Sequence, residues 1–243
     1  MPKTKPGLVI GLADRLDSLS GLFAVGLVPT GSKDPFALRR AALGLVQNLI
    51  AWDMDFDLRA GLELAAKELP TKASPESQAD GLAFITRRLN SLLREQGYNF
   101  DVVEAVLAAQ GNNPAGAARA AGQLSTWVAR KDWDIILPAY SRCVRITREY
   151  ADRFKVDPKK FSESAEKELF KALEIAESVE RADGSVDDFL NAFMPMIPAI
   201  DKFFEDVMVM VEDASLRNNR LGMLQRIAAI ADWVADLSYL EGF

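Results

Sequence analysis

The sequence predicts an all-α protein made of two helical parts, and three observations support this fold class. Polar residues stand directly before proline at four places, which is typical of helix starts, because the polar side chain caps the helix and proline needs no N–H there. Between these places apolar residues recur at the spacing of one helix face. The alternation typical of β-strands is almost absent. About ten helices joined by short loops would account for this pattern.

Four dipeptides mark expected helix starts in chain order: Asp34-Pro35, Ser74-Pro75, Asn113-Pro114 and Asp157-Pro158. After the first of them, Asp34 is expected to cap a helix whose Phe36 and Leu38 point inward. Gly97 and Gly111 each follow a helical run and predict its end.

The helical spacing is clearest in two segments. The first follows Ser74 and contains Leu82, Ile85, Leu89, Leu92 and Leu93; the second, near the C-terminus, contains Leu221, Leu224, Ile227, Ala231 and Val234. One run alternates like a strand, Val207–Val211, but Phe203, Phe204 and Leu216 flank it. We therefore interpret it as a buried helical stretch.

A boundary between the two parts is expected near residues 130–132, where the charge balance changes sign. Residues 1–131 carry 15 Lys and Arg against 13 Asp and Glu, whereas residues 132–243 carry 14 against 22. The net charge of −6 is not that of a nonspecific nucleic-acid binder, so any RNA contact needs a local basic patch. The same charge argument leads us to expect no DNA partner. We also expect no membrane partner, because no apolar run is long enough to span a bilayer.

The absence of histidine excludes most familiar catalytic and metal sites. With no His and one Cys, the chain cannot form a Ser-His-Asp triad, a Cys-His dyad or a thiolate-imidazole zinc site. We assign no catalytic residue. The single Cys143 also excludes an internal disulfide framework and is typical of a protein in the reducing environment of the cytoplasm.

Two motifs near the N-terminus contain candidate binding residues. In residues 13–19, Asp14 and Asp17 lie one helical turn apart, so they could hold a metal ion or pair with Arg15. Residues 29–40 form a tight Pro-Thr-Gly-Ser-Lys turn that leads into a helix, which could hold a phosphate or simply cap the helix.

Two arginine clusters follow in the second part. Arg217 and Arg220 lie three residues apart beside an apolar stripe, so they could contact phosphate or a base. They could instead pair with the carboxylates of Glu205, Asp206, Glu212 or Asp213. Arg142, Arg145 and Arg148 form a basic strip near Tyr140 and Tyr150; they could contact RNA or pair with the acidic helix expected over residues 163–180.

These motifs resemble the β subunit of bacterial-type heterotetrameric glycyl-tRNA synthetase. The resemblance rests on residues 13–40 and on residues 203–221, Phe-Phe-Glu-Asp-Val-Met-Val-Met…Leu-Arg-Asn-Asn-Arg-Leu. Residues 87–89 and 101–106 match the intervening helices. That family's β subunit is much longer, so the chain resembles its C-terminal portion only.

The resemblance implies a domain plan and partners. Residues 1–131 would be the end of an HD-like helical domain and a helical connector, and residues 132–243 an anticodon-binding helical domain similar to that of arginyl-tRNA synthetases. The partners would be the tRNA for glycine and the α subunit, which activates glycine. ATP and Mg²⁺ would serve the whole enzyme, and this chain would hold no cofactor.

The resemblance also implies which residues meet tRNA. Arg142, Arg145, Arg217 and Arg220 are the candidates for contact with the anticodon arm, and Lys33, Arg39 and Arg40 for contact elsewhere on tRNA or for packing. Ser141 departs from the family pattern, which has a Lys-Arg pair after the tyrosine.

Two alternatives from other classes remain. The chain could be a helical scaffold that docks the α subunit without touching RNA. It could also be a remnant of an HD-type phosphohydrolase that uses Asp14 and Asp17 with a metal ion, although the histidine ligands of such a site would lie upstream.

Overall fold

The protein is described by a computed structural model that covers residues 2–243, and the described residues form an all-α fold without a sheet. The chain divides into two compact units, one ending at Gly122 and the other comprising Gln123–Phe243, which we call the N-terminal and the C-terminal unit. The division falls within α6 (Pro114–Val128), a few residues before the boundary expected from the charge pattern. No helix in the described part is long and apolar enough to cross a membrane.

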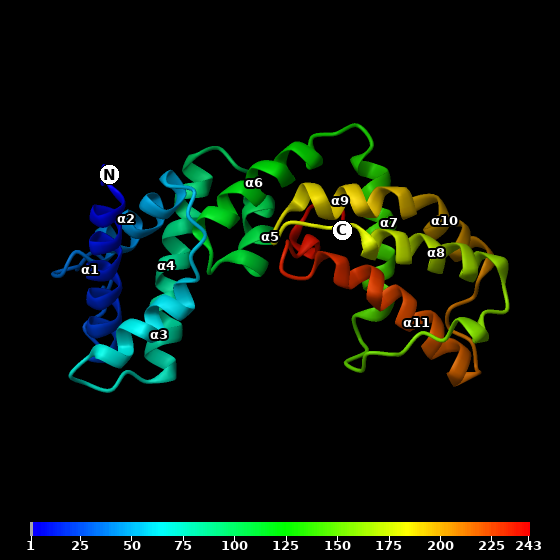
Figure 1. Ribbon diagram of the computed structural model, residues 1–243, viewed down its shortest axis with the longest axis horizontal. Coiled ribbons are helices and arrows are strands. Elements are labelled where there is room, and N and C mark those ends of the chain that lie inside the picture. Colours follow the sequence, from blue (N-terminus) through cyan, green and yellow to red (C-terminus); the bar gives the residue numbers. More distant parts are fainter. Residues whose placement is uncertain (1) are drawn as a thin grey trace. The chain divides into compact units, whose positions relative to one another are not determined.

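The N-terminal unit is a bundle around α1 (Lys5–Ala24). This helix packs against α2 (Leu38–Ala51), α3 (Leu58–Glu68) and α4 (Pro75–Glu95), and α5 (Phe100–Gln110) packs against α4 (Figure 1). Apolar side chains at helical spacing form its core: Leu8, Leu12, Leu16, Leu19 and Phe23 from α1, and Phe84, Ile85, Leu89 and Leu93 from α4.

The C-terminal unit is built on α7 (Trp133–Thr147) and α11 (Ala214–Ala228), which pack against each other (Figure 1). α8 (Ser164–Ser178) packs against α9 (Val186–Phe193), α10 (Ile197–Asp206) and α11. The core centres on Tyr140, whose ring meets those of Phe189 and Phe193 edge-on at centroid distances of 5.6 and 5.5 Å. Its hydroxyl donates to the Ala228 carbonyl at 2.9 Å, which joins α7 to the end of α11.

Two of the four expected helix starts are confirmed as α-helix starts. Ser74 caps α4 by accepting from Ser77 N, and Asn113 accepts from Gly116 N at the start of α6. The other two differ. Asp157 caps only the short 3-10 helix Pro158–Lys160, while α8 begins later, with a capping box between Glu163 and Glu166.

Asp34 caps α2, but it lies four residues before the first residue of the helix instead of directly before it. Its carboxylate accepts from Leu38 N at 2.8 Å and from Arg39 N at 3.0 Å, but Pro35 and Phe36 form a turn before α2 begins. Leu38 is buried as expected, whereas Phe36 is 50% exposed, because the turn carries it out of the helix face. The expectation that Phe36 points inward is therefore wrong.

Replacing Asp34 with alanine is expected to lower the free energy of unfolding by about 1 kcal/mol, because two helix N–H groups lose their acceptor. Pro35→Ala should change it by much less, since the Asp34 carboxylate remains in place. Thermal unfolding followed by circular dichroism measures both. An Asp34→Ala variant as stable as the wild type would show that water replaces the cap without cost.

The helical interpretation of Val207–Val211 is wrong. α10 ends at Asp206, and the next five residues form an irregular segment that starts in extended conformation, with φ −120° and ψ 118° at Val207. Val207 and Val209 are each 5% exposed, while Met208 and Met210 are 73% and 51% exposed. The alternation in the sequence thus reflects an irregular segment in which buried and exposed side chains alternate.

Candidate nucleic-acid interface

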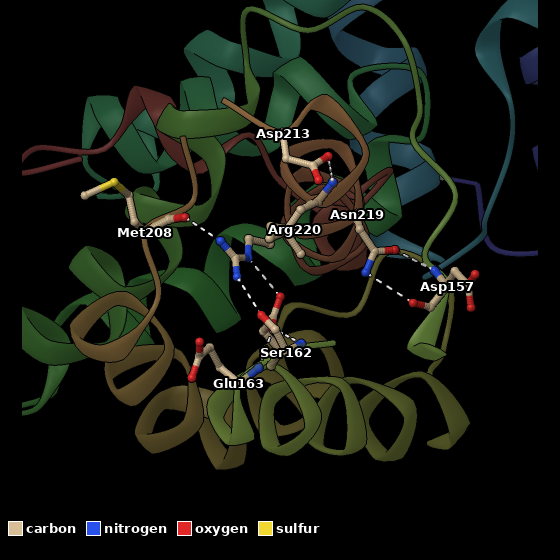
Figure 2. A network of polar contacts seen from close by, with 9 residues as sticks. Asp157, Ser162, Glu163, Met208, Asp213, Asn219 and Arg220 are labelled. Carbon is tan, nitrogen blue, oxygen red and sulfur yellow. Dashed lines mark hydrogen bonds and ion pairs between the residues drawn. The ribbon is translucent and has the colours of Figure 1, made fainter. Parts of the chain in front are cut away.

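A buried ion pair between α11 and α8 organises the surface of the C-terminal unit. The Arg220 side chain is 5% exposed, and its Nε donates to Glu166 Oε1 at 2.9 Å. Its Nη2 donates to Ser162 Oγ at 3.2 Å, and its Nη1 donates to the main-chain oxygen of Met208 at 2.8 Å (Figure 2). One guanidinium therefore joins α11, the start of α8 and the irregular segment 207–211.

Glu166 is satisfied on both carboxylate oxygens. Its Oε2 accepts from the main-chain N–H groups of Ser162 and Glu163 at 2.8 and 2.9 Å. Burial opposes its ionisation, but the Arg220 guanidinium and these N–H donors outweigh burial and hold the pKa of the carboxyl below its usual value. Glu166 is therefore charged at neutral pH, and the Arg220 charge is neutralised inside the protein.

Arg217 holds the other end of the same segment. Its Nη1 donates to the Val211 carbonyl at 2.9 Å, and its side chain is half-buried. Residues 207–211 are thus attached to α11 at two main-chain oxygens, those of Met208 and Val211. Figure 2 shows the Met208 carbonyl directed toward Arg220 and the Met208 thioether directed away from it.

Two side-chain amides on α11 hold a second loop, residues 148–160, by hydrogen bonds to its main chain. Asn219 accepts from Asp157 N at 2.6 Å and donates to Asp157 O at 3.2 Å (Figure 2). Gln225 accepts from Phe154 N at 3.0 Å and donates to Asp152 O at 2.8 Å. A Cβ on Gly222 would lie 2.6 Å from Phe154 O, so the absence of a side chain lets this loop approach the helix.

In the basic strip predicted on α7, Arg142 forms an ion pair, whereas Arg145 and Arg148 are exposed. Arg142 pairs with Asp201 on α10, not with α8 as one alternative expected, and its guanidinium lies 5.1 Å from the centre of the Phe204 ring. Arg145 is exposed, with its guanidinium 5.7 Å from the Phe243 ring centre. Arg148 follows the helix and is exposed, without an ion pair to any described residue.

The predicted residues of the N-terminal unit lie on its surface. Lys33 and Arg40 are exposed, whereas Arg39 is half-buried and donates to the Gly31 carbonyl at 2.5 Å. Asp14 and Asp17 are both exposed on α1, and Arg15 donates to the Gly11 carbonyl at 2.6 Å. Within residues 2–243, no group of three or more His, Cys, Asp or Glu side chains could hold a metal ion.

The structure favours the ion-pair alternative for Arg220, with a different partner. None of the four carboxylates considered from the sequence pairs with it; the partner is Glu166, more than fifty residues away along the chain. The Arg220 guanidinium has three protein partners and its side chain is only 5% exposed, so little of its surface is accessible to RNA. The structure thus gives Arg220 a structural role, which makes it the weakest of the four candidates for direct RNA contact.

Sequence reasoning missed several exposed residues close to these loops. Met208 and Met210 are exposed, and the Tyr150 hydroxyl lies 3.9 Å from the Met210 sulfur. Arg153 and Lys155 are exposed on the loop that Asn219 and Gln225 hold. The alternation of residues 207–211 was the available signal, because it matches the alternation of buried and exposed side chains in the structure.

Comparisons with known proteins agree with the fold and the motifs. Residues 1–108 match the family model for the glycyl-tRNA synthetase beta subunit, and residues 136–232 match the model for the DALR anticodon binding domain. The second match lies within the C-terminal unit and includes most of α7, the loop 148–160, the segment 207–211 and α11.

Relatives match along almost the whole chain. A chloroplastic/mitochondrial glycine–tRNA ligase from Arabidopsis thaliana is 39% identical over 100% of this chain and 23% of its own length. Glycine–tRNA ligase beta subunits from Moorella thermoacetica and Aromatoleum aromaticum are 35% and 39% identical over 99% of the chain and 36% of their own length. The chain thus spans about a third or less of the relatives that it matches. The chain belongs to the family of glycyl-tRNA synthetase β subunits, of which it represents a C-terminal portion.

Proposed function

We propose that this chain is the tRNA-recognition portion of a cytoplasmic glycyl-tRNA synthetase β subunit, and that its C-terminal unit binds the anticodon arm of the tRNA for glycine. The match of residues 136–232 to an anticodon-binding model carries this proposal. The α subunit is the protein partner, and ATP and Mg²⁺ serve the whole enzyme. The chain itself supplies no catalytic residue and contacts neither DNA nor a membrane.

The charge distribution supports a focused contact instead of a broad basic face. Residues 123–243 carry 16 Lys and Arg against 22 Asp and Glu, so the unit as a whole repels RNA. Among the candidates, Arg145 keeps an exposed guanidinium without an acidic partner among the described residues. Arg142 and Arg217 are half-buried and engaged, so we assign them a smaller share of direct contact. Lys33, Arg39 and Arg40 remain candidates for contact elsewhere on tRNA.

Binding of the chain to the tRNA for glycine and to a non-cognate tRNA, measured across a salt series, tests the proposal. We expect a preference for the cognate tRNA and a shallow salt dependence, because few phosphates are contacted. Arg145→Glu should weaken binding several-fold and reduce the salt slope by about one. Lys171→Glu, the same charge change on exposed α8, is the matched control and should have little effect.

Equal binding of both tRNAs with a steep salt slope would contradict anticodon-arm recognition and indicate generic basic contacts. Absence of RNA binding together with retained binding of the α subunit would favour the scaffold alternative.

A further inference from the structure

We propose that Met208, Met210 and Tyr150 form a platform on which an unpaired base of the anticodon loop stacks. The inference rests on the proposed function and names the surface that meets the RNA. We call these three residues the thioether platform. All three lie in the stretch that matches the anticodon-binding model.

Exposure is the first observation. Met208 and Met210 are 73% and 51% exposed, although Val207 and Val209 are each only 5% exposed. Met208 and Met210 flank the buried Val209 in the chain, and both side chains are exposed to solvent. Tyr150 comes from the end of the α7 region and places its hydroxyl 3.9 Å from the Met210 sulfur. Its ring in turn meets the Phe154 ring at 5.8 Å.

Rigidity is the second observation. Bonds from Arg220 and Arg217 hold the main-chain oxygens of Met208 and Val211, and the Val207 and Val209 side chains are buried beneath the segment. Gln225 holds the main chain on both sides of Arg153 by its bonds to Asp152 and Phe154. The apolar side chains therefore protrude from a backbone that is already ordered, which reduces the entropy lost when a ligand binds.

The charges around the platform favour RNA over an apolar protein partner. Residues 148–160 carry five Lys and Arg and three Asp and Glu, in a unit with an acidic excess. Arg148, Arg153 and Lys155 are exposed and form no ion pair with a described residue. These cations can meet phosphates while a base lies on the apolar side chains, which is how proteins hold unpaired nucleotides.

The acidic residues that flank segment 207–211 in the chain indicate which part of the RNA lies on the platform. Glu205 and Glu212 are exposed at the two ends of the segment, while Asp206 pairs with Lys202 and Asp213 caps α11. A phosphate would be repelled there, whereas an uncharged base would not. We therefore expect the RNA phosphates to meet the exposed cations of residues 148–160 and not Glu205 or Glu212.

The test compares binding of two hairpins to the chain. One is the anticodon stem-loop of the tRNA for glycine; the other has the same stem, closed by a non-nucleotide linker so that no base is unpaired. The double variant Met208→Ala/Met210→Ala should bind the stem-loop about tenfold more weakly, the order expected when a stacked base loses its platform. Its binding to the linker-closed hairpin should not change. Met208→Leu/Met210→Leu should keep most of the affinity, because it keeps the apolar surface.

Trp233→Ala is the matched control, since Trp233 is the most exposed large apolar side chain of the same unit, at 83%. It should bind both hairpins like the wild type. The proposal is overturned if the Met208→Ala/Met210→Ala variant binds the stem-loop as tightly as the wild type, or if it loses only binding of the α subunit. These results leave tRNA recognition intact, whereas a wild-type chain that binds neither the stem-loop nor the full tRNA would refute both proposals.

Discussion

Replacing Arg220 with methionine is expected to lower the free energy of unfolding of the C-terminal unit by about 3–5 kcal/mol. The change leaves the Glu166 carboxylate buried with no cation, and it frees the Met208 carbonyl and the Ser162 hydroxyl. Urea denaturation followed by circular dichroism measures the loss. Arg217→Met is the control; it removes one hydrogen bond from a half-buried side chain and should cost about 1 kcal/mol.

A second replacement should recover much of this loss. In Arg220→Met/Glu166→Leu both charges are absent, so no buried carboxylate remains to be stabilised, and an apolar pair can substitute for a buried ion pair. If the double variant were as unstable as the sum of the single variants, the cost would arise from lost hydrogen bonds and not from an uncompensated charge. These bonds are those of Arg220 to Met208 and Ser162 and those that Glu166 accepts from the N–H groups of Ser162 and Glu163.

The same ion pair predicts a pH dependence. The folded-state pKa of Glu166 lies below its usual value of 4.5. The ionised carboxylate therefore contributes stability that is fully present above pH 4.5 and is lost as the pH falls through the lower, folded-state pKa. Wild type should lose stability in this acidic range more steeply than Arg220→Met/Glu166→Leu, when urea midpoints are compared at successive pH values.

Replacing Tyr140 with alanine is expected to cost about 3–5 kcal/mol, the range for removing a buried aromatic ring. The side chain is almost fully buried, and its ring contacts Phe189 and Phe193, with Phe243 at a centroid distance of 6.5 Å. The cavity left behind would lie between α7 and α9. Thermal and urea unfolding of the whole chain measure the effect.

Tyr140→Phe separates the ring from the hydroxyl. It keeps the aromatic packing and removes only the bond to the Ala228 carbonyl, so it should cost about 1 kcal/mol. A phenylalanine variant as unstable as the alanine variant would mean that the bond to the end of α11, and not the packing, holds these helices together.

Local chemistry made the N-terminal unit largely predictable. Ser74, Asn113 and Asp34 all act as caps, because capping depends on the few residues that follow. The apolar spacing of α4 is also confirmed, with Ile85, Leu89 and Leu93 buried. Asp157 fails as the start of an α-helix because Asn219 binds its main-chain N–H and carbonyl, a contact that no local pattern encodes.

The candidate interface could be predicted only in part, since it depends on contacts between distant segments. The basic strip of α7 was visible, but Asp201, the partner of Arg142, lies on another helix. Four acidic residues near Arg220 in sequence made a local ion pair plausible, yet the guanidinium reaches Glu166 on α8. The exposure of Met208 and Met210 was not predicted for a related reason. The run was interpreted as a buried helix, whereas the segment is irregular and exposes both side chains.

The bonds from α11 to main-chain atoms also affect how freely the surface can change. Arg220, Arg217, Asn219 and Gln225 grip carbonyl and amide groups, which every residue but proline supplies in full. Side chains at positions 153, 155, 208 and 210 can therefore be exchanged without altering what the helix holds. The chain separates the atoms that determine the shape of its loops from those that meet a partner, so new binding preferences can arise at this surface while the fold is maintained.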